Sequence, residues 1–408
     1  MATGQEGVMI RKRKAVLALA LVAVAATVVV AGSTASPEQA GTVTIGWAFD
    51  GSGAMAPFDG PALATARDRV KQVNRGSGVN LRITTCDTQG NKPATAKSCA
   101  ARLLGQGADV IFTTCDVDFA APVVQESINA GKLTIAPCIG TDQMGPKRFG
   151  AKGKLAFSYG NVAQDEGSAM AEYAWKRGWR DAALATDTVI VYFRNVVQAF
   201  EARWRQLGGN IVAEETYQSL GGNPASWQNI ATRLNREEAD VIVTSTAAAF
   251  GAQVPILNGL RTLGNNTPML NSWAGDGNYW YTPNPMVTNY YYVTFASAFG
   301  DDPVAAVNAL AKRNKAAIAK GGSTGGFITG PAAIDGLVTA LKRTGGSTNG
   351  ARLAAEMEKF KNVTTLSGKV SFSKSLHTVF GRQYRVIRVQ NNVPKVVGTI
   401  KAKVVPKI

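Results

Sequence analysis

A chain of 408 residues, of which 45% are hydrophobic, is long enough for two domains that each bury a core, and a charged fraction of only 18% excludes a disordered polyelectrolyte. The formal net charge of +16 would suit a nucleic-acid partner, but lysine and arginine are scattered and have few aromatic neighbours in register. We therefore expect a solvated basic surface that faces anionic cell-envelope material, and no nucleic-acid binding.

The first segment predicts export. A positive cluster at residues 11–14 precedes an uncharged apolar run at 15–31, and small residues at 33–36 supply a cleavage region. This order is that of a secretory signal peptide, which we place at residues 1–35. The apolar run is near the lower length limit for a membrane span, so an uncleaved N-terminal tether is the alternative. Either way, we expect the protein in the periplasm or elsewhere in the cell envelope.

Export makes the four cysteines informative, because an even number in an oxidising compartment suggests two disulfides. Cys86 ends a predicted strand and Cys99 lies in the helix expected to fold back beside it, so this pairing is favoured. Cys115 and Cys138 each follow a strand end and could pair too, although four cysteines allow three connectivities. A metal site is the weaker interpretation, since the sequence has no CxxC and only one histidine, His377.

From residue 42 on, short apolar runs alternate with longer amphipathic ones, which predicts βαβ units. Strands are expected at 43–48, 79–86, 110–114, 133–137, 181–185, 210–215, 241–245, 268–271, 369–372, 384–390 and 395–400. Helices are expected at 61–74, 93–105, 119–130, 166–177, 192–207, 226–237, 250–263, 304–319, 330–343 and 350–361. Because the order of the first half recurs from residue 181, we predict an α/β protein of two Rossmann-like lobes with parallel central sheets and a cleft between them.

This order also predicts the domain boundaries. We assign 42–162 to lobe 1, 163–290 to lobe 2, 291–365 to helices that return to lobe 1, and 366–408 to C-terminal strands that belong mostly to lobe 2 and the hinge.

The candidate site lies in the loops after the strands, because ligands of open α/β sheets gather at the carboxyl ends of the strands. The first such loop, 49–56, matches GxGxxA. A dinucleotide fingerprint would need an acidic residue about twenty positions on, and Asp87 lies too far along, so a glycine-rich binding loop is the better account. The sequence has no GxxxxGK[ST] either, and we expect no cofactor.

The loop after the third strand carries Asp116 and Asp118 just before a helix, whose N-terminus offers backbone N–H donors. Asp116 can be an N-cap or a ligand contact, whereas Asp118 is assigned to the cap. Aromatic residues near the strand-end loops would suit the walls of a small-molecule cleft, although core packing is the commoner role for any one of them. These are Trp47, Phe49, Phe58, Phe119, Tyr192, Trp273 and Trp280.

Catalysis has little support in the sequence. A Ser-His-Asp arrangement would depend entirely on His377, which falls in the late β region, and no GxSxG elbow occurs. Strand-end aspartates leave a carboxylate-pair hydrolase as an alternative, but no spacing singles out a pair. They are Asp50, Asp87, Asp116, Asp187 and Asp276. We do not expect an enzyme.

Several loop motifs occur in the order and spacing of one known family. They are Thr44-Ile45-Gly46 with Gly51-Ser52-Gly53, the stretch 84–99 with its cysteine pair, Gly107-Ala108-Asp109-Val110-Ile111, the D-x-x-Y-like turn 187–192 with two extra residues, and the G-x-V-x-F strand 366–372. Across residues 42–400 the chain thereby resembles the type I periplasmic binding proteins, and among them the branched-chain amino acid or leucine-binding-like substrate-binding proteins of ABC transporters.

The resemblance implies a monomeric Venus-flytrap protein whose lobes, joined by hinge crossings, close on a small polar solute such as an amino acid or amide and then dock on importer permease subunits. A sensor module with the same fold is the alternative. In the family, a Ser or Thr and backbone N–H groups hold the ligand's carboxylate. Here Asp116 stands at that place and would repel a carboxylate, and Phe193 replaces the turn glycine.

The resemblance also implies a ligand set, in which Asp276 is the candidate partner for an ammonium group. The assigned residues are Phe49, Ser52, Asp116, Phe119, Cys138, Gly140, Thr141, Tyr192, Ser245, Thr246, Trp273 and Asp276.

Overall fold

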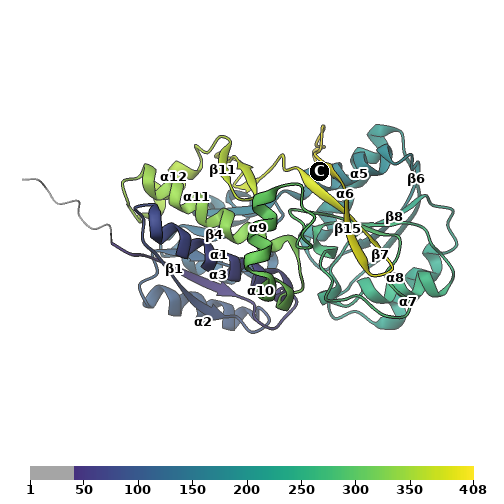
Figure 1. Ribbon diagram of the computed structural model, residues 1–408, viewed down its shortest axis with the longest axis horizontal. Coiled ribbons are helices and arrows are strands. Elements are labelled where there is room, and N and C mark those ends of the chain that lie inside the picture. The colour runs from purple at the N-terminus through teal and green to yellow at the C-terminus, as the bar shows by residue number, and fades with distance from the viewer. Residues whose placement is uncertain (1–40) are drawn as a thin grey trace, which may run out of the picture. The chain divides into compact units, whose positions relative to one another are not determined.

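The computed structural model describes residues 41–408 and contains two large β-sheets, each flanked by helices (Figure 1). We call the six-stranded sheet with its helices lobe 1 and the seven-stranded sheet with its helices lobe 2. The predicted signal peptide at 1–35 lies outside the described residues. Within 41–408, no helix combines the length and the apolar character that crossing a membrane requires.

Lobe 1 is built on a parallel sheet with strand order β13-β5-β4-β3-β1-β2. Side chains alternate between two apolar layers: Trp47 and Phe112 pack with helices α1 and α11, whereas Ala48 and Ile111 pack with α2. The strands are β1 (Val43–Phe49), β2 (Leu81–Asp87), β3 (Val110–Phe112), β4 (Thr134–Ala136), β5 (Ala156–Asn161) and β13 (Thr378–Val379). The helices are α1 (Ala56–Gly76), α2 (Pro93–Gly105), α3 (Val117–Asn129), α4 (Pro146–Phe149), α11 (Thr329–Arg343) and α12 (Gly350–Met357).

Lobe 2 is built on a mixed sheet with strand order β15-β14-β10-β9-β8-β6-β7. Its strands are β6 (Asp181–Asp187), β7 (Asn210–Tyr217), β8 (Val241–Ser245), β9 (Met269–Asn271), β10 (Tyr290–Thr294), β14 (Tyr384–Gln390) and β15 (Val393–Ile400). Its helices are α5 (Ala163–Lys176), α6 (Val191–Leu207), α7 (Pro224–Leu234) and α8 (Gln253–Thr262).

Shorter elements complete the chain. They are α9 (Ala305–Arg313), α10 (Lys315–Lys320), the two-stranded β11 (Val363–Thr365) and β12 (Gly368–Val370), and the 3₁₀ turns η1 (Gly150–Leu155), η2 (Ala248–Phe250), η3 (Trp273–Gly275) and η4 (Gly325–Ile328). The η4 turn packs on α1 of lobe 1, where the Thr65 hydroxyl donates a hydrogen bond to the Phe327 carbonyl at 2.7 Å.

The predicted α/β class with two Rossmann-like lobes is confirmed, but the expectation that both central sheets are parallel is wrong for lobe 2. There β14 runs antiparallel to β10 and to β15. Asn391 and Asn392 join the two last strands with φ values of 52° and 63°. Positive φ at both turn residues is typical of a type I′ hairpin, which forces an antiparallel pair.

The sequence pattern did not predict two central strands, β5 and β10, or a break in one helix. Strand β5 (AFSYGN) contains polar residues and a glycine, so it has no apolar run. Strand β10 (YYYVT) begins with three tyrosines, whose polar tips weaken the hydrophobic pattern. The helix expected over 304–319 is divided at Asn314, which leaves helical geometry with φ −110° and ψ 17°.

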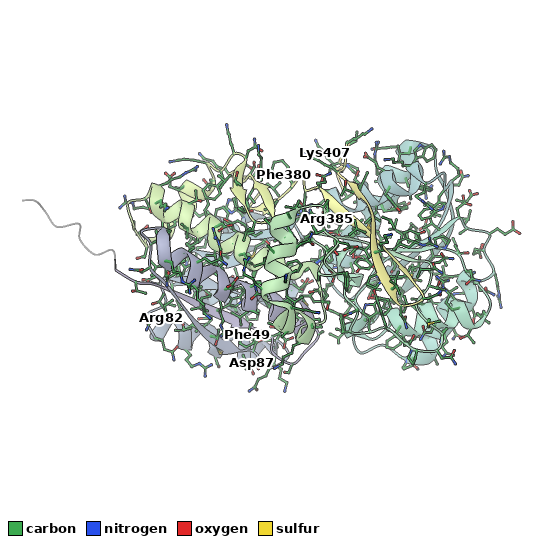
Figure 2. All side chains as sticks on the ribbon, in the orientation of Figure 1. Phe49, Arg82, Asp87, Phe380, Arg385 and Lys407 are labelled. Atoms are coloured by element: carbon green, nitrogen blue, oxygen red, sulfur yellow. A yellow bond between two sulfur atoms is a disulfide. The ribbon has the colours of Figure 1, made fainter. Side chains whose placement is uncertain are left out.

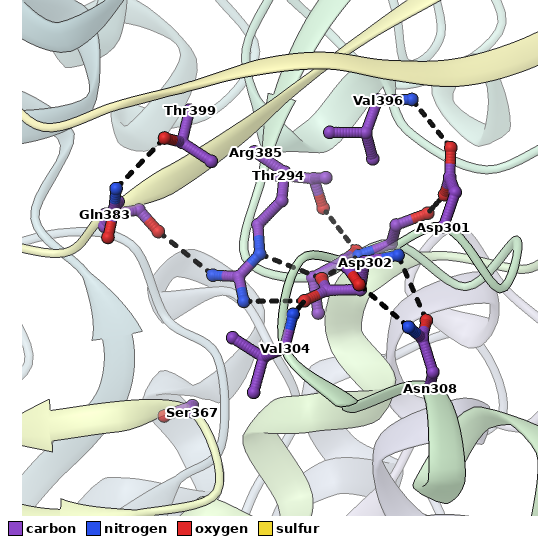
Figure 3. A network of polar contacts seen from close by, with 12 residues as sticks. Thr294, Asp301, Asp302, Val304, Asn308, Ser367, Gln383, Arg385, Val396 and Thr399 are labelled. Atoms are coloured by element: carbon purple, nitrogen blue, oxygen red, sulfur yellow. Dashed lines mark hydrogen bonds and ion pairs between the residues drawn. The ribbon is translucent and has the colours of Figure 1, made fainter. Parts of the chain in front are cut away.

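The chain passes between the two sheets three times, and buried polar contacts hold these crossings together. At the first and third, Asp165 Oδ2 accepts hydrogen bonds from the Asn161 amide and from the backbone N–H groups of Gly381 and Arg382. At the second and third, Arg385 donates to both carboxylate oxygens of Asp302 at 2.8 and 2.9 Å (Figure 3). Hydrogen bonds therefore link the three crossings to one another.

Candidate functional site

A small cavity lies where strand-end loops of the two lobes meet, and we call it the cleft cavity. Its lining residues are Met55, Phe58, Cys115, Asp116 and Gly140 from lobe 1, and Ile190, Tyr192, Phe193, Ala247, Phe250, Trp273 and Ala274 from lobe 2. Its volume is about 20 Å³, enough for one water molecule. The lobes are therefore closed on each other in this structure.

Aromatic rings form much of the wall of the cleft cavity. Phe58 from lobe 1 meets Trp273 from lobe 2 edge-on, with ring centroids 5.0 Å apart, and Trp273 stacks on Phe295 at 4.7 Å. On the other side, Phe119 lies 6.0 Å from Phe250 across the lobes. Rings at these separations attract each other beyond simple burial. The wall thus offers flat apolar surface from both lobes.

Asp116 is the one carboxylic acid among the residues that line the cleft cavity. It caps α3: its Oδ1 accepts hydrogen bonds from the N–H groups of Asp118 at 2.9 Å and Phe119 at 3.4 Å. Its Oδ2 accepts none from any residue within 41–408. Burial, followed by repulsion from Asp118, raises the pKa of Asp116 to about 7. Asp116 is therefore both the cap and an available acceptor in the cavity.

Tyr192 and Trp273 are held in place by Glu166, which was not among the predicted site residues. Glu166, fully buried near the start of α5, accepts a hydrogen bond from the Tyr192 hydroxyl at 3.0 Å and one from the Trp273 backbone N–H at 2.6 Å. Burial raises its pKa to about 8. Tyr192 in turn lies against Gly140, where a Cβ would be 2.6 Å from the ring. A glycine is therefore needed for this contact between the lobes.

Two carboxylates carry hydrogen bonds between the lobes at the edges of the cleft. Asp118 Oδ2 accepts from the backbone N–H of Val191 at the start of α6, at 2.9 Å. Asp276 Oδ2 accepts from the backbone N–H of Gly325, which lies beside α1, at 2.6 Å. Burial raises the pKa of Asp276 to about 8, and its Oδ1 is buried without a partner within the described residues. The structure places Asp276 outside the lining of the cleft cavity.

Phe49 and Ser52 line a larger groove of about 670 Å³ beside the cleft cavity. Lobe 1 supplies most of its wall, Ala249 and Tyr279 of lobe 2 add to it, and residues of α10 and the turn after it complete it. Phe49 ends β1 directly beside Asp87, the last residue of β2 (Figure 2). The groove is therefore a candidate entrance, not the closed cavity itself.

The other predicted ligand residues are satisfied by the protein. Cys138 forms a disulfide with Cys115, and Cys86 forms one with Cys99. The Thr141 hydroxyl accepts a hydrogen bond from a neighbouring backbone N–H. Ser245 and Thr246 form hydrogen bonds with side chains at other strand ends. The Ser245 hydroxyl lies 2.8 Å from that of Ser272, and the Thr246 hydroxyl donates to Asp187 at 2.8 Å.

Of the twelve predicted ligand residues, the structure thus brings Asp116, Gly140, Tyr192 and Trp273 together in the cleft cavity. Among the other lining residues, Met55, Phe193, Ala247 and Phe250 were not predicted to contact a ligand, and Phe58 was predicted only as one of the aromatic residues near the loops. Met55 lies in the first glycine loop and Phe58 just after it, so their position at a strand end was a usable signal. Glu166 carried no such signal, because it lies in a helix.

The fold and sequence match one family of known proteins. A family model described as periplasmic binding protein matches residues 42–394. The sequence matches no curated protein. Among solved structures, the chain resembles the branched-chain amino acid transporter substrate-binding protein LivJ of Streptococcus pneumoniae in complex with isoleucine. The TM-score is 0.74 and the identity 19%, over 90% of this chain and 100% of that one.

Two further structures show the same fold. A leucine-binding protein of Thermotoga maritima is 17% identical with a TM-score of 0.68, over 88% of this chain and 98% of that one. An ABC transporter solute-binding protein of Rhodopseudomonas palustris in complex with p-hydroxybenzoic acid is 16% identical with a TM-score of 0.73, over 89% and 98%. The matched family model covers most of the chain and these folds agree with it, so the chain belongs to the periplasmic binding protein family.

Proposed function

We propose that this protein is an extracytoplasmic solute-binding protein that delivers a small solute to the permease subunits of an ABC importer. The observation that carries the proposal is the cleft cavity, whose walls come from strand-end loops of both lobes. Such a cavity exists only when the lobes meet, so a solute bound there would stabilise the closed form. At about 20 Å³ the cavity seen here cannot hold such a solute, so binding requires the lobes to separate and then to close around the solute at a slightly wider spacing.

The lining of the cleft cavity suggests the class of solute. Neither lysine nor arginine belongs to the lining, and the free acceptor is Asp116 Oδ2. We propose a solute with a flat or branched apolar part and a hydrogen-bond donor, such as an amino acid, an amide or an aromatic amine. Isoleucine and p-hydroxybenzoic acid, the ligands of the similar structures, share the apolar part. A solute that carries only a carboxylate would need Asp116 to be protonated.

A thermal-shift screen tests this proposal. The purified protein is heated with amino acids, amides, aromatic amines and aromatic acids at pH 6 and pH 8. A solute present at a hundred times its Kd should add about 2.7 kcal/mol of stability. Because Asp116 ionises near pH 7, an amine should bind more tightly at pH 8 and a carboxylate at pH 6. Asp116→Asn should remove this pH preference.

The matched control is Glu238→Gln, which removes a carboxylate from an exposed position outside the cleft. A hit that is unaffected by Asp116→Asn would place the solute elsewhere. Chemical analysis of the bound compound separates binding from hydrolysis, since a binding protein returns the solute intact. A panel without any hit would contradict the proposed class of solute.

A further inference from the structure

A second cavity lies at the crossings between the lobes and shares no lining residue with the cleft cavity. Its volume is about 570 Å³, and we call it the crossing pocket. Four segments line it: the start of α9, the turn between β11 and β12, the third crossing, and the end of β15. The residues are Pro303, Val304, Ala306, Val307, Thr365, Leu366, Ser367, Gly368, Lys369, Gly381, Arg382, Gln383, Arg385, Thr399 and Lys401.

The ionisable groups that line the crossing pocket are all basic: Lys369, Arg382, Arg385 and Lys401. Arg385 is neutralised by Asp302, as described above (Figure 3). The two lysines are exposed and form no ion pair with any residue of 41–408. The pocket therefore carries positive charge on both lysines that no direct ion pair within 41–408 neutralises.

Arg382 adds a buried donor to this wall. Its side chain is 6% exposed, and its two terminal nitrogens donate to the carbonyls of Ser367 at 3.0 Å and Tyr159 at 2.9 Å. Its Nε is buried and has no partner within the described residues. The guanidinium also lies over the Phe295 ring, 4.6 Å from its centroid, and it forms no direct ion pair within 41–408, although the charges of Asp165 and Glu166 act on it from a distance. Asp165 accepts from the backbone N–H of Arg382 and not from its guanidinium, and the same oxygen also accepts from Asn161 and Gly381.

We propose that the crossing pocket binds a small polyvalent oxyanion, either inorganic phosphate or the phosphate group of a larger molecule. Two free ammonium groups beside a buried guanidinium are the donors that phosphate oxygens require. The pocket volume exceeds that of a monatomic ion and leaves room for a substituent on the phosphate. Lys369 comes from the β12 hairpin near α11, and Lys401 follows β15 of lobe 2. A bound oxyanion would therefore bridge segments of both lobes.

Titration calorimetry of the full protein tests the site with inorganic phosphate and, in a second arm, with glycerol phosphate, against sodium chloride at matched ionic strength. The test variant is Lys369→Ala with Lys401→Ala. The control is Lys374→Ala with Lys395→Ala, which removes the same charge from exposed positions outside the pocket. We expect saturable binding in the wild type and the control, and about tenfold weaker binding in the test variant.

Loss of binding in both double variants would reveal a general charge effect and overturn the proposal, as would binding retained in the test variant or absent from the wild type. Tighter binding of glycerol phosphate than of phosphate would assign the site to a phosphate ester, and the reverse to the free ion. Asp116→Asn should leave phosphate binding unchanged. The outcome is therefore independent of the solute proposed for the cleft.

Discussion

The lobes are connected in two regions: the chain crossings, two of which are tied together by Asp302 and Arg385, and the cleft, where Phe58 meets Trp273. At the crossings, each oxygen of Asp302 accepts one hydrogen bond from the Arg385 guanidinium and one from a backbone N–H group. In the cleft, the contacts are largely between aromatic rings, and the available oxygen of Asp116 has no partner within the described residues.

This difference matches two requirements of a protein with two lobes: the crossings must keep the lobes together, and the cleft must open. Charge-assisted hydrogen bonds in a buried setting lose much when separated, because each partner would keep an unpaired charge. Aromatic contacts can be exchanged for similar contacts with a solute at little cost. The crossings are thus suited to hold the lobes as one molecule, and the cleft is suited to a replaceable ligand.

The largest expected effect is on the crossings. Asp302→Ala leaves Arg385 buried without its partner and should lower the free energy of unfolding by about 3–5 kcal/mol, measured by denaturant titration. Glu356→Ala breaks an exposed ion pair with Lys359 and should cost less than about 1 kcal/mol. Similar losses in the two variants would show that the buried pair at the crossings is no stronger than a surface ion pair.

The second-largest expected effect is on the pH dependence of stability, through Glu166, the buried acid behind the cleft wall. The unfolded chain releases the Glu166 proton near pH 4.5, but burial in the folded protein holds it until about pH 8. Between pH 4.5 and about pH 8, unfolding therefore releases this proton. The free energy of unfolding falls as the pH rises in this range, by up to about 1.4 kcal/mol per pH unit for this one group. Asp59, Asp116 and Asp276 have pKa values raised by burial and act in the same direction.

Glu166→Gln should therefore flatten the fall in stability between pH 5 and pH 8, as followed by denaturant titration at each pH. The variant keeps an acceptor for the Trp273 N–H, so its stability at pH 5 should remain near that of the wild type. Glu238→Gln should leave the slope unchanged. A slope in Glu166→Gln equal to that of the wild type would show that the carboxyl is ionised in the folded protein.

The smallest effect is on closure at the edge of the cleft. Asp118→Asn replaces the carboxylate that accepts from Val191 N–H and pairs with Arg148. Because this side chain is about one third exposed, we expect only two- to threefold weaker solute binding by calorimetry. Glu126→Gln, equally exposed but paired with Lys97 inside lobe 1, serves as the control. An equal loss in both would exclude a role for Asp118 in closure.

Much of the fold could be predicted from local pattern, whereas only part of the site could. Strand-end position pointed to Asp116, Gly140, Tyr192 and Trp273, since carboxyl ends of parallel strands meet at one edge. Ser245 and Thr246 satisfied the same criterion but bond to Ser272 and Asp187 of their own lobe. A rule based on strand ends does not distinguish side chains that face the cleft from those that close the loops.

The amino-acid sequence by itself determined the repeated α/β order, the helix start next to Asp116 and Asp118, and the candidate edge of each sheet, because periodicity and capping depend on neighbours a few residues apart. The tertiary structure alone decided that Glu166 supports Tyr192 and Trp273, that Asp302 pairs with Arg385 across 83 positions, and that Lys369 and Lys401 share a pocket. These contacts join segments distant in the chain, and no local pattern encodes which distant segments will meet.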